Sequence, residues 1–288
     1  QEYAHWLPQE KMAKVLGQLK EAVADESRAR EIGLESELAM EVAWVDTTCL
    51  KANIHFPADW VLLRDAVRTL IKAIVVIRRH GLLVRMAEPE EFMAAMNAQA
   101  MGMSAAARRK PGSKKARKRV LRGMKKISKR VREHAERYRE ALDKKWEQTE
   151  LTRREAEVIL RRMDGVLAQL PAAVKQAHER IIGERAVANA DKILSLYERD
   201  IHVIVRGKAG ADVEFGNSLF VAETASGFIL DHELRRGASP GDAKWLQERY
   251  ELMKVASGGR LCGVVGDRGF DSAGSRKKLA QEEAFNGL

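Results

Sequence analysis

Residues 42–54 have the sequence VAWVDTTCLKANI and mark an abrupt change in the character of the chain. Before them, residues 10–41 are rich in Lys, Glu, Ala and Leu, with apolar side chains at helical spacing, which predicts a helix or a helix pair. Within 42–54, β-branched residues and a tryptophan replace these helix formers, which predicts a β-strand. The strand carries one acidic residue, Asp46, between apolar neighbours.

Helices are expected directly after this strand. Pro57 ends the extended run, Asp59 is suited to cap the next helix, and apolar residues then recur at helical spacing as far as Gly81. Asp65 is expected on the surface of that helix. Apolar periodicity over 115–197, with one run ending at Pro171, predicts two or three long antiparallel helices.

Strand character returns in the last third of the chain. Expected elements are strands at 202–206, 215–224 and 228–234, a helix at 242–255, an all-apolar strand at 261–265 and a helix at 272–283. Ser226 and Gly227 supply the turn of a hairpin between the second and third of these strands. The order is therefore strand, helical insertion, hairpin, helix, strand and helix.

Composition favours a globular protein with a polyanionic partner. The 288 residues are 45% hydrophobic and carry a formal charge of +10, which favours nucleic acid or an anionic membrane as partner. No segment has the roughly 18 uninterrupted apolar residues of a membrane span, and no signal segment begins the chain, so an intracellular protein is expected. Both ends of the sequence are expected to be cut. Cys49 and Cys262 lack metal-ligand spacing and are expected as buried thiols.

The positive charge is concentrated in one segment. Between residues 108 and 132, 14 of 25 residues are Lys or Arg and none is acidic. The densest part comprises Arg108, Arg109, Lys110, Lys114, Lys115, Arg117, Lys118, Arg119 and Arg122. Contact with DNA phosphates is the favoured function, and a solvated face of a helical arm is the alternative. Because aromatic residues are scarce here, the contacts are expected to be electrostatic rather than base-stacking.

Two aspartates are candidate catalytic residues. Asp46 lies inside a strand, so it is expected to face a cleft or to be buried, where a cation would offset the cost of its charge. Asp267 follows the last apolar strand, and Gly266 and Gly269 beside it would let a metal ion or phosphate approach. Taken singly, an aspartate at a strand end serves a turn or cap more often than it serves catalysis. The acids of the sequence Asp-His-Glu at 231–233 are expected to be structural.

Three ordered blocks carry a family resemblance. They are VDTTCLKANIHFPADWVLLRDAVRTL at 45–70, RGKAGADVEFGNSLFVAETASGFILDHELRRGASPGDAKWL at 206–246 and VVGDRGFDSAGSRKKL at 264–279. Together they resemble insertion-sequence transposases of the DDE class, in the group with the IS-four and IS-five type of catalytic domain. The resemblance spans about half the chain. It implies an α+β fold with an RNase H-like mixed sheet, interrupted by a long helical insertion between the first strand and the hairpin.

The expected organisation follows from this resemblance. Residues 1–41 form an N-terminal helical segment, 42–80 and 201–288 form the two parts of the RNase H-like core, and 81–200 form the basic helical insertion. Asp46 and Asp267 match the family's first and second catalytic aspartates. The resemblance implies that neighbouring strands bring them together to hold Mg²⁺ or Mn²⁺ for phosphodiester cleavage and strand transfer.

The resemblance also implies partners and a location. Double-stranded DNA, as element ends and as target, would be bound by a homo-oligomer without membrane contact. The protein would be cytoplasmic, and associated with the nucleoid when bound to DNA.

The family's third acid, a glutamate on a later helix, would lie beyond Leu288, and Glu282 and Glu283 stand too close to Asp267 to match it. The chain as given is therefore expected to be catalytically incomplete. Two alternatives remain: a non-enzymatic basic DNA-binding protein derived from a transposase, and an RNase H-like nuclease without strand transfer.

Overall fold

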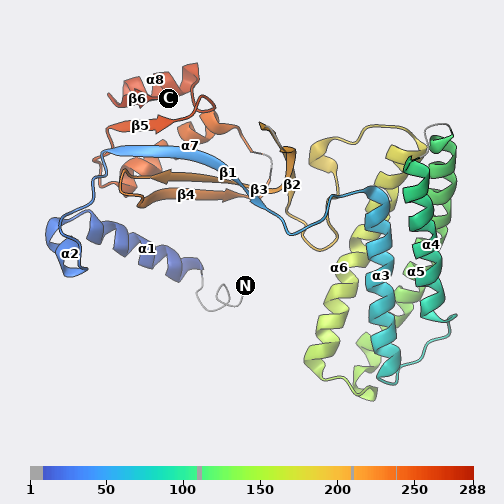
Figure 1. Ribbon diagram of the computed structural model, residues 1–288. Helices are drawn as coiled ribbons and strands as arrows, with labels where there is room; N and C mark the ends of the chain where they lie inside the picture. Colours follow the sequence, from blue (N-terminus) through green and yellow to red (C-terminus); the bar gives the residue numbers. More distant parts are fainter. Residues whose placement is uncertain (1–8, 109–111, 209–210, 238) are drawn as a thin grey trace. The chain divides into compact units, whose positions relative to one another are not determined.

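The computed structural model describes residues 9–108, 112–208, 211–237 and 239–288 (Figure 1). The fold is α+β with a mixed sheet. The chain divides into two compact units. The sheet unit comprises the residues up to 51 together with 204–288, and the helical unit comprises 52–203.

The described elements follow one another in this order. They are α1 (Gln9–Val23), α2 (Glu26–Glu31), β1 (Val42–Lys51), α3 (Asp59–Arg79), α4 (Pro89–Arg108), α5 (Ser113–Lys145), α6 (Arg153–Ala177), β2 (His202–Lys208), β3 (Ala211–Glu223), β4 (Ile229–Arg235), α7 (Asp242–Ala256), β5 (Gly263–Gly266), α8 (Ala273–Gln281) and β6 (Phe285–Gly287). Short 3₁₀ turns occur at Trp146–Gln148 and Asn189–Asp191, and a π-helical turn at His178–Ile182 follows α6.

β1 is the centre of the sheet. It pairs antiparallel with β3 on one side and parallel with β5 on the other, and β6 continues the parallel side beyond β5 (Figure 1). β2 and β4 both lie beside β3. The backbones of β1 and β3 lie very close together where Lys51 pairs with Gly216. A Cβ on Gly216 would lie 2.1 Å from the carbonyl oxygen of Leu50. Glycine at this position therefore lets the two backbones approach.

Alternation along β1 separates a covered face from an open one. Ala43 and Val45 are buried, whereas Trp44 and Asp46 are exposed. Trp245 of α7 is fully buried in the same apolar cluster as Ala43 and Val45, with its ring centroid 5.8 Å from that of Phe220 of β3. The covered face of the sheet is thus the one on which α7 packs.

The acids of β4 are held by arginines and a tryptophan. Arg249 donates hydrogen bonds of 2.8 and 2.6 Å to the carboxylate of Asp231, which is buried. Glu233 accepts a 3.0 Å bond from the indole of Trp245 and a 2.7 Å bond from Arg235. Burial acts to raise the pKa of Glu233, but these bonds and the arginine charges lower it below its usual value. These contacts agree with the structural role expected for the two acids.

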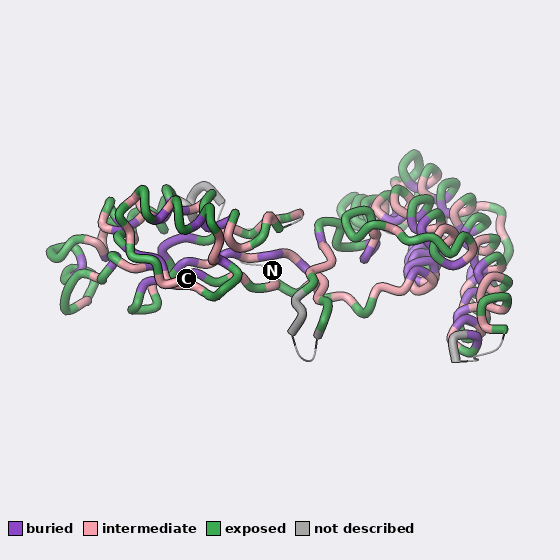
Figure 2. The backbone as a smooth tube through the Cα atoms, turned by 90° about the horizontal axis from the view of Figure 1, so that it is seen from above, coloured by how far each residue is buried: buried purple, intermediate pink, exposed green. Residues whose placement is uncertain are grey.

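The helical unit has its own core. Helices α3, α4, α5 and α6 lie side by side in Figure 1, and the buried stretches in Figure 2 follow their packed sides. On α5 the buried positions recur every three or four residues, at Leu121, Met124, Ser128, Val131, Ala135, Tyr138 and Leu142. The hydroxyl of Tyr138 donates to the Val84 carbonyl at 2.8 Å and accepts from the Val84 amide at 3.1 Å. These bonds fix α5 to the segment before α4.

The helical unit begins earlier than the sequence analysis placed it. α3 packs against α4, α5 and α6, so the insertion starts at residue 52 rather than 81. The expectation that a helical run ends at Pro171 was wrong, because α6 continues through Pro171 to Ala177. Pro171 has no backbone N–H to donate within the helix. The packing of α6 against α3 and α5 stabilises the helical conformation in spite of this missing hydrogen bond. α4 and β6 were not predicted from the sequence.

Several local predictions need correction. Asp59 is the first residue of α3 rather than its cap, and Asp65 is buried instead of lying on the helix surface. Cys49 is half-buried and Cys262 is exposed, so neither is the buried thiol expected from the sequence. In the part of the chain that the structure describes, no helix combines the length and the apolar character needed to cross a membrane.

Asp231→Ala is expected to destabilise the protein by about 3 kcal/mol, because it leaves the Arg249 guanidinium partly buried without its carboxylate. Urea denaturation followed by tryptophan fluorescence would measure this change. Asp271→Ala is the matched control, since it removes a solvated ion pair with Arg276 and should cost much less than Asp231→Ala. Equal losses for the two variants would contradict a structural role specific to Asp231.

Candidate functional site

Parallel pairing places the two candidate aspartates at matching positions. In the register of β1 with β5, Val45 is opposite Gly266. Asp46 follows Val45 in the middle of β1, and Asp267 follows Gly266 just past the end of β5, so the two residues come from neighbouring strands. The carboxyl ends of parallel strands are where α/β proteins display ligand-binding groups. The structure thus brings together two residues that are far apart in sequence.

Asp46 does not lie where the sequence analysis expected it. It is exposed on the open face of β1, between the exposed side chains of Trp44 and Thr48, rather than in a cleft or buried. Its Oδ1 accepts a 2.7 Å hydrogen bond from the amide of Thr47. Burial therefore imposes no need for a compensating cation at Asp46, and the case for a metal depends on the neighbouring carboxylates instead.

Asp267 lies in a tight turn at the end of β5. Its Oδ1 accepts a 2.8 Å bond from the amide of Gly269, and its carbonyl accepts a 3.0 Å bond from the amide of Phe270. Gly266, which was expected to leave space for a ligand, is instead closely packed, since a Cβ there would lie 2.9 Å from Val45 and 3.1 Å from Phe270. Gly266 therefore allows close packing beneath the aspartate.

A third carboxylate, Asp242, lies beside Asp267, and it bonds to Thr47, whose side chain is on the opposite face of β1 from Asp46. Asp242 is the first residue of α7, and its Oδ1 accepts a 2.8 Å bond from the hydroxyl of Thr47. A Cβ on Gly269 would lie 2.5 Å from Oδ2 of Asp242 and 2.9 Å from Oδ1 of Asp267. The two carboxylates therefore flank the α-carbon of Gly269. Sequence reasoning missed Asp242, although its position within the family-like block at 206–246 could have singled it out.

The donor chemistry of this edge suits a hard cation. Carboxylate oxygens are the ligands that Mg²⁺ and Mn²⁺ prefer, and Asp46, Asp242 and Asp267 supply them from β1, α7 and the end of β5. Among the described residues, however, no three acidic, histidine or cysteine side chains are already close enough to hold an ion together. The arrangement therefore supplies ligand types without a preassembled cage.

Other acids near this edge have structural partners. Glu282 pairs with Lys254 at 2.6 Å and with Lys278 at 3.3 Å, and so ties the end of α8 to α7. Asp271 binds Arg276, and Ser272 is the residue that caps α8. Neither acid is placed to join the three aspartates as a free ligand.

His55, in the helical unit, lies 3.1 Å from the carboxylate of Asp65 through its Nε2. Its ring is mostly exposed, while Asp65 is buried at the start of the bundle. This pairing agrees with a structural histidine.

The basic residues form one continuous face on α5. Lys115, Arg119, Arg122, Lys126 and Lys129 recur at helical spacing and are all exposed. Within the described part of the chain, no carboxylate pairs with the first four of these. Arg109 and Lys110 lie outside the described residues, as does the side chain of Arg108. Lys114, Arg117 and Lys118 lie toward a different side of α5, where Lys114 and Lys118 contact Glu184.

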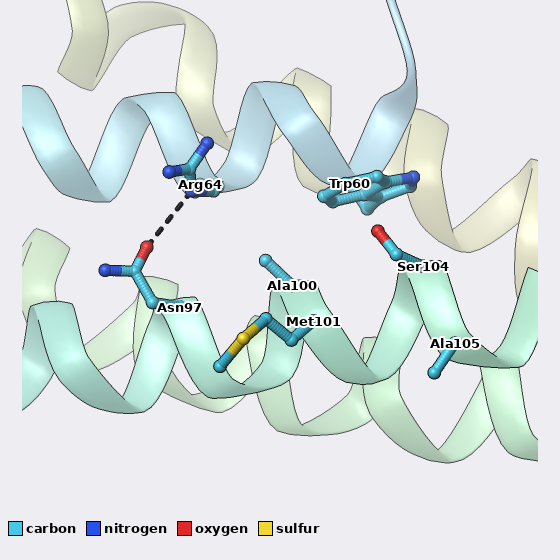
Figure 3. Close-up of a pocket in the computed structure, with 7 residues that line it drawn as sticks. All are labelled: Trp60, Arg64, Asn97, Ala100, Met101, Ser104 and Ala105. Carbon is cyan, nitrogen blue, oxygen red and sulfur yellow. Dashed lines mark hydrogen bonds between the residues drawn. The ribbon is translucent and has the colours of Figure 1, made fainter.

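A pocket of about 520 Å³ separates part of α3 from α4 (Figure 3). The ring of Trp60 faces Ser104 across it, and Met101 and Ala100 form an apolar side. The guanidinium of Arg64 donates a 3.1 Å bond to the side-chain oxygen of Asn97, so these two polar groups already satisfy each other. The pocket is therefore mainly an apolar hollow on the helical unit.

Comparisons of the chain with protein-family models, with curated proteins and with solved structures gave no match.

Gly269→Ala is expected to destabilise the sheet unit by about 1–3 kcal/mol, because the new methyl group overlaps the carboxylates of Asp242 and Asp267. Adding Asp242→Ala should restore part of the loss by removing one of the overlapping groups. Gly17→Ala is the control, since nothing lies within 4 Å of that site, and alanine in a helix should be neutral or stabilising. Thermal unfolding of the variants measures these effects. The absence of rescue in the double variant would contradict the described contact.

Proposed function

We propose that this protein is a DDE-type DNA transposase, or a part of one, in which Asp46 and Asp267 hold a divalent metal ion and the basic face of α5 binds DNA. The observation that carries the proposal is the parallel register of β1 and β5, in which Val45 is opposite Gly266, the residues that directly precede Asp46 and Asp267. This is the adjacency that the family resemblance of the three sequence blocks implies.

The sheet supports an RNase H-like core. The resemblance implies two neighbouring strands that carry the aspartates and a hairpin from the middle block. β1 and β5 are such neighbours, and β3 with β4 is an antiparallel hairpin on the other side of β1. The long helical unit lies between β1 and this hairpin in sequence, as expected for an interrupted core.

The chemistry of the aspartates supports metal-dependent phosphodiester cleavage. Asp46 and Asp267 would hold Mg²⁺ or Mn²⁺, and Asp242 is close enough to Asp267 to contribute a further oxygen. When bound, the ion would supply Lewis acidity at a scissile phosphate. The chain's own contribution is to fix these carboxylates through the Thr47 amide, the Gly269 amide and the Thr47 hydroxyl.

The charge distribution supports DNA as the substrate. Four exposed cations of α5 lack carboxylate partners within the described residues and so remain able to contact phosphates: Lys115, Arg119, Arg122 and Lys126. Aromatic side chains are absent from the helix between residues 113 and 137, so base stacking has no platform there. Binding through this face should therefore depend little on DNA sequence. The same proposal includes a homo-oligomer of this chain that binds two DNA ends together.

Asp46→Asn and Asp267→Asn are each expected to weaken Mn²⁺ binding on the order of tenfold or more, because each removes a charged ligand. Isothermal titration of the whole chain with Mn²⁺ measures this without requiring catalysis. Asp271→Asn is the matched control and should leave affinity unchanged, since that acid pairs with Arg276. Mn²⁺ binding that all three variants retain would refute the metal site.

Neutralising the basic face should flatten the salt dependence of DNA binding. A variant with Gln at Lys115, Arg119, Arg122 and Lys126 is expected to lower the slope of log affinity against log salt by about one for each phosphate that is no longer neutralised. A control with Gln at Arg153, Arg154, Arg161 and Arg162 removes the same charge from exposed positions of α6. Fluorescence anisotropy with a short duplex measures both slopes. If the two variants behave alike, the DNA-binding face is not on α5.

The two experiments also separate the alternatives. DNA binding without Mn²⁺ binding at the aspartates would favour a non-enzymatic DNA-binding protein. Binding of both DNA and Mn²⁺ would be compatible with a nuclease and with a transposase. A strand-transfer assay distinguishes these two, because only a transposase forms a joined DNA product.

A further inference from the structure

A second charged site lies in the helical unit, where the start of α5 meets the segment that follows α6. α5 and α6 run antiparallel, since Arg139 pairs with Asp164 and Lys125 contacts His178. Their meeting encloses a pocket of about 370 Å³. The polar residues that line it are Asp59, Lys114, Arg117, Arg180, Glu184 and Arg185. Four of these six side chains are cationic, so the pocket favours an anion.

Two of the cations form a fixed wall. Arg180 donates hydrogen bonds of 2.8 and 3.0 Å to the carboxylate of Asp59, which is buried and also accepts a 2.9 Å bond from Gln176. Arg185 pairs with Glu179 of the π-helical turn. Each of these guanidinium groups already has a carboxylate partner. They therefore shape the wall of the pocket and are less available to bind a ligand.

Lys114, which lines the pocket, and Lys118, one turn further along α5, share one carboxylate. Lys114 and Lys118 lie 2.9 and 2.6 Å from the two oxygens of Glu184. Hydrogen bonds from Lys118 and Lys114 lower the pKa of Glu184 to about 2, so this carboxylate stays charged at any pH near neutrality. Protonation of Glu184 therefore cannot release the lysines, and only a competing anion can.

Glu184 is held in an unusual backbone conformation. Its φ of +54° lies in the left-handed region that non-glycine residues rarely adopt, and it follows the π-helical turn His178–Ile182. Backbone strain and π-helical turns both concentrate at functional positions. The backbone at Glu184 is thus held in an unfavourable conformation, and in this conformation the Glu184 carboxylate reaches Lys114 and Lys118.

Arg117 lines the same pocket, but no ion pair joins it to Glu184 among the described residues. Its side chain is half-buried, and its Nε is buried without a hydrogen-bond partner among the described residues. A buried donor without a partner is costly, so an arriving acceptor would be stabilised there. The start of α5 adds to this preference for anions, because its cap Gly112 offers no side chain and its first turn has no acid.

We propose that this pocket binds a phosphate of the DNA backbone through Lys114, Arg117 and Lys118, and that the Glu184 carboxylate takes the place of that phosphate in the free protein. The inference rests on the DNA-binding part of the proposed function. Binding would exchange one anion for another, since the phosphate takes over the lysines from Glu184 and also supplies an acceptor to Arg117. Glu184 is then a built-in competitor that sets the affinity of the helical unit for DNA.

Glu184→Gln should tighten binding to a short duplex on the order of fivefold, since it removes two surface ion pairs that compete with the phosphate. Arg117→Gln should weaken binding and lower the salt slope by about one, while Arg117→Lys should restore part of the slope. Glu147→Gln and Arg154→Gln carry the same charge changes at the opposite end of the α5–α6 pair, and both residues are exposed. Anisotropy titrations of the full chain measure all five variants. The proposal is overturned if Glu184→Gln matches Glu147→Gln and Arg117→Gln matches Arg154→Gln.

Inorganic phosphate provides a second measurement that does not depend on DNA. Phosphate should raise the melting temperature of the wild-type chain more than that of Arg117→Gln, and it should stabilise Glu184→Gln at lower concentration. If the wild type responds to phosphate in this way but binds no duplex, the pocket binds a phosphate group that does not come from DNA. In that case the proposed DNA-binding function is wrong as well. If the four-residue variant of α5 alters the salt slope while the Glu184 and Arg117 variants match their controls, only the pocket inference fails.

Discussion

The parallel hydrogen bonding between β1 and β5 is the constraint on which the sheet unit depends. It sets Val45 opposite Gly266, the residues that directly precede Asp46 and Asp267. Parallel neighbours cannot be joined by a tight turn, so the chain must return to the same end of the sheet through the β3–β4 hairpin and α7. That return places Asp242, at the start of α7, beside Thr47 and Gly269. The same pairing requires glycine at 266, because Val45 and Phe270 fill the space that a side chain would need.

The antiparallel pairing of β1 with β3 explains why a whole helical unit can be inserted between them. Lys51, at the end of β1, is opposite Gly216 near the start of β3, so the insertion occupies the position of a hairpin connection. A unit inserted there must stabilise itself. α3, α4, α5 and α6 do so with an apolar cluster separate from that of the sheet. The proposed function assigns the candidate carboxylates to the sheet unit and the basic face of α5 to the helical unit.

Ion pairing distinguishes structural charges from available ones. In the sheet unit, Asp231, Glu233 and Glu282 are each bound by arginine or lysine, whereas the bonds described for Asp46, Asp242 and Asp267 come from amides and a hydroxyl. On α5, Lys115, Arg119, Arg122 and Lys126 lack carboxylate partners within the described residues, whereas Lys114 and Lys118 share Glu184. Charges that the protein leaves without a counter-ion are the ones available to a ligand, because pairing them within the protein would remove their attraction for it.

The sequence by itself determined the elements whose signal is local. β-branched residues and a tryptophan predicted β1, and strand composition with a turn signal predicted the β3–β4 hairpin. Helical spacing predicted α3, α5, α6 and α7, and charge density singled out the start of α5. Only the tertiary structure decided which faces meet. It put α3 in the helical unit, carried α6 through Pro171, exposed Asp46 on an open sheet face, and set Asp242 beside Asp267 and Glu184 beside Lys114. The reason is physical: periodicity records how a segment divides its own apolar and polar sides, whereas contacts between distant segments depend on packing that no single segment contains.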